Sequence, residues 1–210
     1  MTQLAKLKIQ PRMLRSQGGA SLIMVMMILT IVSILGIGGV QIAIMSERGA
    51  RNDRDKQIAW QSAEAALIDA EFDIFGPGTS TRRATTFAPR TNINAFIDGC
   101  GASGASVGLC AIVGTGKPAW LTVKFDIFDS TAQTTQFGAF TGRTFAAGGV
   151  GVQPSKAPRY VIEAIPDQFG AGSGSRNLSA SEVKYLYRVT SMGFGPRDDI
   201  QAVLQMIYRN

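Results

Sequence analysis

The sequence contains no histidine, only two cysteines among 210 residues, and one long stretch without any charge. Without histidine, Ser-His-Asp and Cys-His catalytic groups cannot form, and most zinc sites lose their usual ligand. The uncharged stretch runs from Ala20 to Met45. As an α-helix it would extend about 39 Å, which exceeds the roughly 30 Å hydrocarbon core of a bilayer. We therefore expect a membrane-spanning helix around which the rest of the chain is organised.

The arm before this stretch is basic and contains no acidic residue. Its charged residues are Lys6, Lys8, Arg12 and Arg15. Because basic arms tend to stay in the cytoplasm, we expect the residues after Met45 to be exported. The formal net charge of +6 falls to +2 when residues 1–19 are left out, since four of the 21 basic residues lie there. The charge therefore reports topology and does not argue for a nucleic-acid partner.

Three interpretations of the N-terminal region compete: a plain membrane anchor, a secretory signal peptide, and a leader that is cut before the apolar run. The secretory signal fits poorly, because the apolar run is too long and no small-x-small cleavage site follows it closely. Gly19 supplies a bond without a side chain where charge ends and apolar sequence begins. The start Ala20-Ser21-Leu22-Ile23 then favours the leader, and the plain anchor remains the alternative.

This junction resembles the type III (class IV) signal of type IV pilins and type II secretion pseudopilins. The resemblance implies cleavage after Gly19 by a prepilin peptidase and methylation of the new N-terminus at Ala20. Counted from Ala20, the fifth residue is Met24, where most pilins carry a glutamate. Methionine offers no charge to a neighbouring amine, which implies a subunit at the filament tip. The alternative is that Met24 is one more lipid-facing side chain.

Three glycines, Gly36, Gly38 and Gly39, cluster in the second half of the apolar run. Each costs a helix up to about 1 kcal/mol relative to alanine. In a filament, outside the bilayer, the helix could unwind here, as it does in assembled type IV pilins. The alternative is a close-packing surface for another membrane helix.

Residues 46–75 are predicted to continue the same helix. Apolar residues recur at three- and four-residue steps and predict the face that packs on a sheet: Trp60, Ala63, Leu67 and Ala70, followed by Ile74. The acidic residues Glu64, Asp69, Glu71 and Asp73 are expected mainly on other faces. Gly76-Pro77-Gly78 should end the helix at Phe75.

The remainder of the chain has a strand-like pattern in four places and turn-rich sequence between them. The predicted strands are 121–128, 160–165, 185–192 and 200–208, with a hairpin connection at 193–199 and a short helix within 91–97. One long helix followed by antiparallel strands predicts an α+β fold with about four strands. The second half of the helix should cover the apolar face of the sheet.

The two cysteines, Cys100 and Cys110, lie in a loop rich in glycine, serine and alanine. Export permits oxidation, so a disulfide is the natural interpretation, and two free thiols are the alternative.

Signals for chemistry are weak throughout. Gly114-Thr115-Gly116-Lys117 matches four residues of a phosphate-binding loop, but Ala111 and Pro118 break the motif. The segment 170–175 lacks the context of a dinucleotide site. The adjacent pair Asp198-Asp199 could help to bind calcium, which needs several oxygen ligands, but two adjacent acids in a turn are usually solvated. We therefore predict neither an enzyme nor a cofactor or metal, and leave a calcium ion near Asp198 and Asp199 open.

Several segments together resemble the PilX-type minor pilins of type IVa pili. The N-terminal signature covers residues 47–71, including Gln61-Ser62-Ala63-Glu64-Ala65-Ala66-Leu67 after Trp60, and later markers lie at 108–110, 158–163, 187–190 and 202–205. The loops between these markers are unmatched. The resemblance implies a pilin fold and a minor pilin that primes a type IV pilus and enters it. It also implies a tip complex with other minor pilins and a large adhesin, in contact with the major pilin.

The expected organisation is a leader at 1–19, a transmembrane or filament-core helix at 20–45, and a periplasmic globular pilin domain at 46–210. Such a protein crosses the inner membrane once, with its N-terminus in the cytoplasm, before it enters the pilus. Two other functions remain: a K-type pseudopilin of type II secretion, and a membrane-anchored periplasmic enzyme. A K-type pseudopilin carries a large inserted domain, for which 210 residues leave little room.

Overall fold

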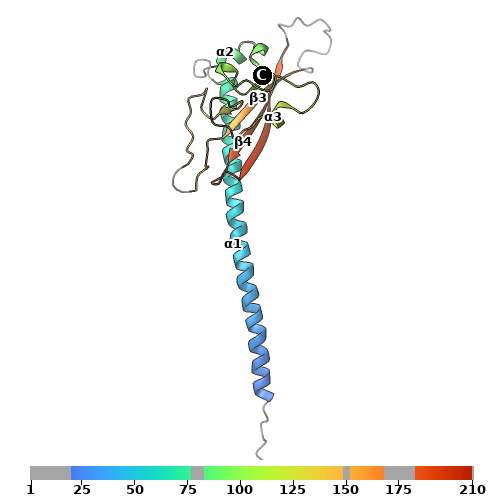
Figure 1. Cartoon of the computed structure of the whole chain (residues 1–210), viewed down its shortest axis with the longest axis vertical. Helices are drawn as coiled ribbons and strands as arrows, with labels where there is room; N and C mark the ends of the chain where they lie inside the picture. Colours follow the sequence, from blue (N-terminus) through green and yellow to red (C-terminus); the bar gives the residue numbers. More distant parts are fainter. Residues whose placement is uncertain (1–19, 77–82, 149–151, 168–182, 210) are drawn as a thin grey trace, which may run out of the picture. The chain divides into compact units, whose positions relative to one another are not determined.

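The computed structural model describes residues 20–76, 83–148, 152–167 and 183–209 (Figure 1). The chain divides into two compact units, Met1–Ala50 and Arg51–Asn210. Helix α1, Ala20–Phe75, begins in the first unit and ends in the second. The predicted helix therefore has the bounds that the sequence indicates. It ends where Gly76 donates its backbone N–H to the Phe72 carbonyl at 2.9 Å, just before Pro77.

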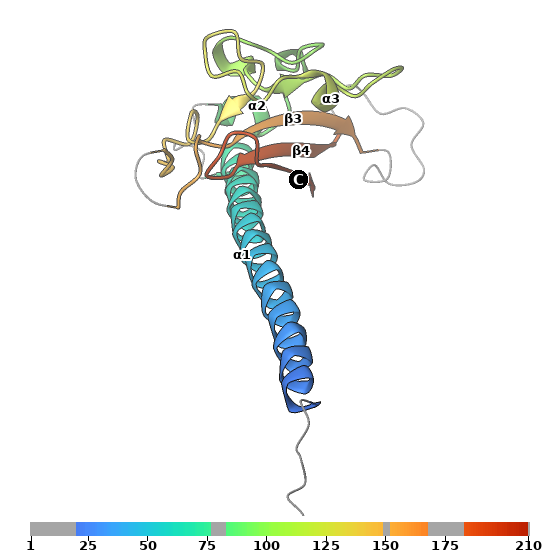
Figure 2. The ribbon, with the colours of Figure 1, turned by 60° about the horizontal axis from the view of Figure 1, so that its bottom comes forward.

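Among the described residues of the second unit, five strands form a sheet that packs on the end of α1. The strands are β1 Leu109–Cys110, β2 Thr135–Gln136, β3 Arg159–Pro166, β4 Tyr185–Phe194 and β5 Gln201–Arg209. Their order is β1-β3-β4-β5, and β2 pairs separately with β3. All pairs are antiparallel except β1 with β3. Figure 2 shows β3 and β4 side by side, with the darker β5 next to β4.

The three long strands were predicted, and the predicted hairpin between β4 and β5 is closed by a bond from Gly195 N–H to the Ile200 carbonyl at 2.7 Å. The predicted strand at 121–128 is wrong. Its first residues lie in the one-turn helix α3, Ala119–Thr122, and the remainder is loop. Val123 and Phe125 are nevertheless buried, because they pack against the disulfide. Residues that often form strands thus pack inside a loop here, because the preference of a residue for a strand depends on the surrounding structure.

Short helical elements fill the loops. They are α2 Ala84–Phe87, η1 Ile93–Ala95 and η2 Gly104–Ser106, the last two being 3₁₀ turns. The helix predicted within 91–97 is thus a single 3₁₀ turn. The loop predicted at 170–175 lies outside the described residues.

The sheet packs on α1 through a face of small residues. Ala59, Ala63, Ala66 and Ala70 are all fully buried, and Leu67 is nearly so. Small side chains allow the helix backbone to come very near β4. Ser191 donates its hydroxyl to the Ala63 carbonyl at 2.9 Å. On β5, Tyr208 donates its hydroxyl to the Leu67 carbonyl at 3.0 Å.

The prediction was wrong for Trp60, which is 48% exposed. Its indole N–H donates to Glu64 one turn further along α1, at 2.8 Å. A helix that approaches the sheet so closely has no room for an indole on the contact face, so the tryptophan lies on the flank. Ala63, Leu67 and Ala70 are buried as predicted.

Two core clusters lie on opposite faces of the sheet. Tyr160 and Ile162 of β3 belong to the cluster that includes α1, Phe87 and Phe96. Val161, whose side chain alternates with theirs, belongs to the second cluster, with the cystine and the segment from Ala119 to Phe125.

Candidate functional site

The first half of α1 is apolar on every side. Every large apolar side chain from Leu22 to Met45 is exposed, and the most apolar 18-residue window of the helix has a mean hydropathy of 2.5. By length and composition this helix could cross a membrane. A helix that is apolar all round belongs in a bilayer or inside a protein assembly, because water surrounds it only at a high cost.

Two hydroxyl groups in this half donate to carbonyls of the same helix. Thr30 donates to the Met27 carbonyl at 2.8 Å, and Ser33 donates to the Leu29 carbonyl at 2.7 Å. Since a hydrocarbon environment offers no other partner, these local bonds remove the cost of burying the two hydroxyls there.

The residues singled out near the N-terminus fall in several places. Gly19 lies outside the described residues, and Ala20 is the first helical residue. The Met24 side chain is 68% exposed. At Gly36, Gly38 and Gly39 the helix is continuous, and no atom lies within 4 Å of where a Cβ would stand. Unwinding in a filament therefore stays a prediction.

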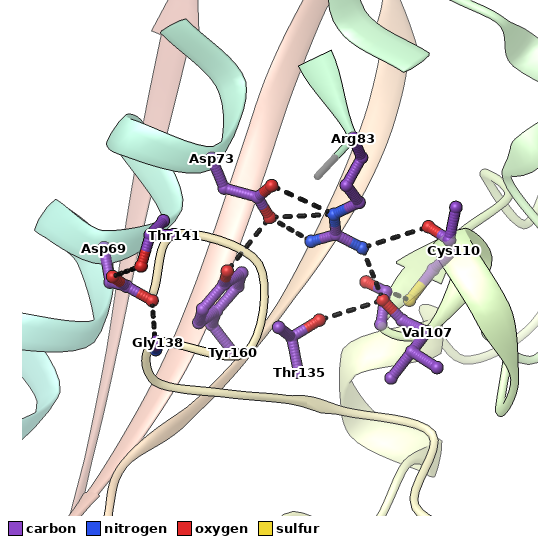
Figure 3. A network of polar contacts seen from close by, with 11 residues as sticks. Asp69, Asp73, Arg83, Val107, Cys110, Thr135, Gly138, Thr141 and Tyr160 are labelled. Atoms are coloured by element: carbon purple, nitrogen blue, oxygen red, sulfur yellow. Dashed lines mark hydrogen bonds and ion pairs between the residues drawn. The ribbon is translucent and has the colours of Figure 1, made fainter. Parts of the chain in front are cut away.

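A buried ion pair holds the other end of α1 (Figure 3). Asp73 accepts hydrogen bonds from Arg83, whose Nε lies 2.9–3.0 Å from its two carboxylate oxygens and whose Nη2 also contacts it. Tyr160 of β3 donates its hydroxyl to the same carboxylate at 2.9 Å. Both charged side chains are fully buried. The pair therefore joins the last turns of α1 to the sheet and to the segment before α2.

Arg83 also reaches the disulfide loop. Its Nη1 donates to the Val107 carbonyl at 2.6 Å and to the Ala105 carbonyl at 3.3 Å. The ring of Phe140 lies against the guanidinium, with its centroid 3.8 Å from the central carbon. One side chain thus links α1, the loop 100–110 and the loop that carries Phe140.

Asp69 makes a second connection one turn earlier in α1. Its carboxylate accepts bonds from the Gly138 N–H at 2.7 Å and the Thr141 hydroxyl at 2.5 Å. Arg143 approaches to 3.7 Å. Burial raises the pKa of Asp69 from its usual 3.8, against the opposing effect of these hydrogen bonds and of Arg143. Burial, together with the nearby Asp73 carboxylate, also raises the pKa of Tyr160 well above its usual value.

The disulfide between Cys100 and Cys110 is present, as predicted. The loop it closes is attached to its surroundings by main-chain carbonyls. Thr135 donates its hydroxyl to the Val107 carbonyl at 2.9 Å, and Ile162 of β3 donates its N–H to the Gly108 carbonyl at 2.8 Å. Gly108 has a φ of +71°, and a Cβ there would come within 2.2 Å of the Thr135 hydroxyl, so only glycine fits.

The acidic residues Asp69 and Asp73 are expected mainly on faces of α1 other than the apolar one, but both are fully buried. A signal was present: each follows a buried alanine by three residues, so they flank the face that packs on the sheet. For Arg83, the partner of Asp73, the sequence contains no comparable sign of burial, because this residue lies in a loop.

Asp198 and Asp199 each have a basic partner. Lys156 Nζ lies 2.8 Å from the Asp198 carboxylate, and Arg197 contacts Asp199. Hydrogen bonds, from Lys156 in one case and Arg197 in the other, lower the pKa of both carboxyls. Within the part of the chain that the structure describes, no group of three His, Cys, Asp or Glu side chains is placed to hold a metal ion.

The first half of the long helix is apolar and exposed, and its second half packs on a sheet that contacts a disulfide-closed loop. This arrangement is the pilin architecture. A model of the PilX N-terminal region matches residues 17–67, and a model of the C-terminal region of the type IV pilus assembly protein PilX matches residues 106–210. The chain therefore belongs to the PilX family of type IV pilus assembly proteins, as the sequence resemblance implies. No curated protein and no solved structure matches it.

Proposed function

We propose that this chain is a minor pilin that primes the assembly of a type IV pilus and is then incorporated into it. The observation that carries the proposal is the exposed apolar first half of α1. The same helix continues into a folded domain, where its second half packs on the sheet. Covering each large apolar side chain gains about 1.5–3 kcal/mol relative to water. Such a helix can pass from a bilayer to a bundle of similar helices without becoming hydrated.

The N-terminal arm determines the orientation of the helix in the membrane. Its basic residues favour a cytoplasmic N-terminus, with residues 46–210 in the periplasm. Cleavage after Gly19 by a prepilin peptidase then removes residues 1–19, and Ala20 becomes the methylated N-terminus. Residues 20–45 form the part of the helix that moves from the inner membrane to the filament core, with Gly36, Gly38 and Gly39 as the segment that can unwind.

The position of the subunit follows from Met24. An intramembrane carboxylate is costly and marks a function, and in most pilins this position docks a new subunit on the previous one. A subunit inserted first has no earlier neighbour and needs no such carboxylate. Met24 therefore supports a place at the tip, in a complex with other minor pilins and a large adhesin, above the major pilin.

The test begins with deletion of the gene and complementation by the full chain. We expect few or no pili in the deletion strain and recovery on complementation. Intact-mass analysis of the mature protein should show a chain that starts at methylated Ala20, and replacement of Gly19 by a bulky residue should leave the precursor uncut.

Other outcomes would point elsewhere. Loss of protein secretion with normal pili would identify a K-type pseudopilin, and loss of an enzymatic activity would identify an anchored enzyme. A mature chain that begins at Met1, or beyond Met45, would contradict the pilin proposal.

A further inference from the structure

The outer edge of β5 is a candidate interaction surface. Among the described residues β5 pairs only with β4, over nine consecutive positions from Gln201 to Arg209. Its other edge therefore presents backbone N–H and C=O groups that no described strand satisfies. At the opposite side of the sheet, β3 is flanked by β1 and β2. Among the described residues, the edge at β5 is therefore open, whereas further strands pair with the β3 side of the sheet.

Natural proteins usually protect a free edge, with lysine, proline, a bulge or a very short strand. The strand β5 has none of these. It contains no lysine and no proline, and its only charged residue is Arg209 at its last position. Its register with β4 is unbroken, which excludes a bulge against β4. An unprotected edge of this length would attract other strands, so it is expected to have a partner in the working assembly.

The side chains of β5 reinforce this interpretation. Val203 and Ile207, which point away from α1, are 48% and 60% exposed. Val203 pairs with Met192, which packs against the cluster around the cystine. An added strand would cover the exposed side of Val203 and extend that cluster. Apolar side chains at every second position of the added strand would match this face.

The size of the edge limits what can occupy it. Nine residues of strand extend about 30 Å, and a strip about 10 Å wide along it buries roughly 300 Å² on each partner, or about 600 Å² in total. A stable complex between free proteins buries about 1,200 Å² or more. A second copy held by this edge alone would therefore dissociate. A segment of a protein held beside this one by other contacts avoids this limit, because tethering raises its effective concentration to the millimolar range.

We propose that β5 accepts an extended segment of a neighbouring, different pilus subunit, which adds to the sheet as a further strand. This inference rests on the proposed function, since the neighbour is held in place by the shared bundle of apolar helices. The added segment carries apolar residues at alternate positions, where they face Val203 and Ile207.

The first experiment places a photo-crosslinking amino acid at Ile207 of the full chain in piliated cells, with Val152 as the matched control. Val152 is 51% exposed and lies in a loop. We expect Ile207 to give one major product with another pilus subunit, and the crosslinked peptide of that subunit to have alternating apolar residues. Val152 should not give this product. A product with a second copy or with lipid, or no product from cells whose pili contain the chain, would overturn the proposal.

The second experiment compares Val203→Lys with Val152→Lys. Lysine is a natural protection of an edge strand, so both full-length variants should fold, which thermal unfolding in detergent checks. Loss of one buried valine contact should lower the amount of the co-isolated neighbour about tenfold for Val203→Lys, and leave it unchanged for Val152→Lys. Equal co-isolation with the parent would refute strand addition.

The two proposals fail in different ways. If the chain is processed and enters pili but Val203→Lys changes nothing, the strand addition is wrong and the minor pilin function stands. If pilus assembly does not depend on the chain at all, the function itself is wrong.

Discussion

Gly193 of β4 lies directly against Ala63 of α1: a Cβ on Gly193 would stand 2.2 Å from the Ala63 backbone nitrogen and 2.3 Å from the Ala59 carbonyl oxygen. No side chain can occupy that space, so the glycine sets how closely the sheet approaches the helix. The neighbouring bond from Ser191 to the Ala63 carbonyl depends on the same approach.

Gly193→Ala should therefore destabilise the domain, because the contact is with rigid backbone rather than with a flexible side chain. We expect a loss of about 1–3 kcal/mol in unfolding free energy, as for other overpacked cores. Urea unfolding of the full chain in detergent measures it. Gly114→Ala is the control, since nothing lies within 4 Å of its Cβ position. Equal stability of the two variants would show that β4 can move away from α1 at no cost.

The Asp73–Arg83 pair should behave as one unit. Removing one partner leaves the other buried without compensation, so Asp73→Asn and Arg83→Met should each cost about 3–5 kcal/mol. The double variant should cost clearly less than the sum of the two, because neither charge is then left alone. A double-mutant cycle of urea unfolding tests this. Strict additivity would mean that the two residues act separately.

Stability should depend on pH through Asp69. Burial raises the pKa of Asp69 in the folded chain above its unfolded value of 3.8. The folded state then binds the proton more tightly, so this residue's contribution to stability is complete below pH 3.8 and is lost as the pH rises through the folded pKa. Asp69→Asn should remove that part of the pH dependence. Unfolding free energies of both proteins from pH 3 upward provide the comparison, and parallel curves would contradict the prediction.

Loss of the disulfide should loosen the region around Arg83. By the chain-entropy model, a loop of about 11 residues contributes on the order of 3 kcal/mol. Cys100→Ser with Cys110→Ser should lower the unfolding free energy by that order, and hydrogen exchange should rise at the amides of Gly108 and Ile162, whose N–H groups donate to the Gly101 and Gly108 carbonyls. The oxidised parent in the same buffer is the control. An unchanged exchange pattern would show that the loop keeps its position without the bond.

Met24→Glu tests the proposed place at the tip. If the subunit is inserted first, a glutamate at this position has no earlier neighbour to neutralise, and its burial in the bilayer has a cost. We expect no gain in piliation and some loss. Immunogold labelling of sheared pili should mark one end of filaments from the parent strain, and label along the shaft would overturn the tip position.

The sequence by itself determined the features that depend on neighbours in the chain. Helix α1 was predictable because its apolar run and its stop at Gly76-Pro77-Gly78 are local signals. The strands β3, β4 and β5 followed from alternating or β-branched residues. The disulfide followed because a chain with a basic arm before its apolar run is expected to be exported, and two cysteines leave one pairing.

Only the tertiary structure decided how far the α1 face that meets the sheet extends: Ala63, Leu67 and Ala70 lie in it as predicted, and Trp60 does not. That limit depends on Gly193, which lies 130 residues after Ala63 and excludes a bulky residue such as Trp60 from the contact. It also decided that Asp69 and Asp73 are buried, because their partners Gly138, Thr141 and Arg83 come from distant loops. A carboxylate is buried where the fold supplies donors for it, and the spacing of residues along one helix does not specify donors from elsewhere in the chain.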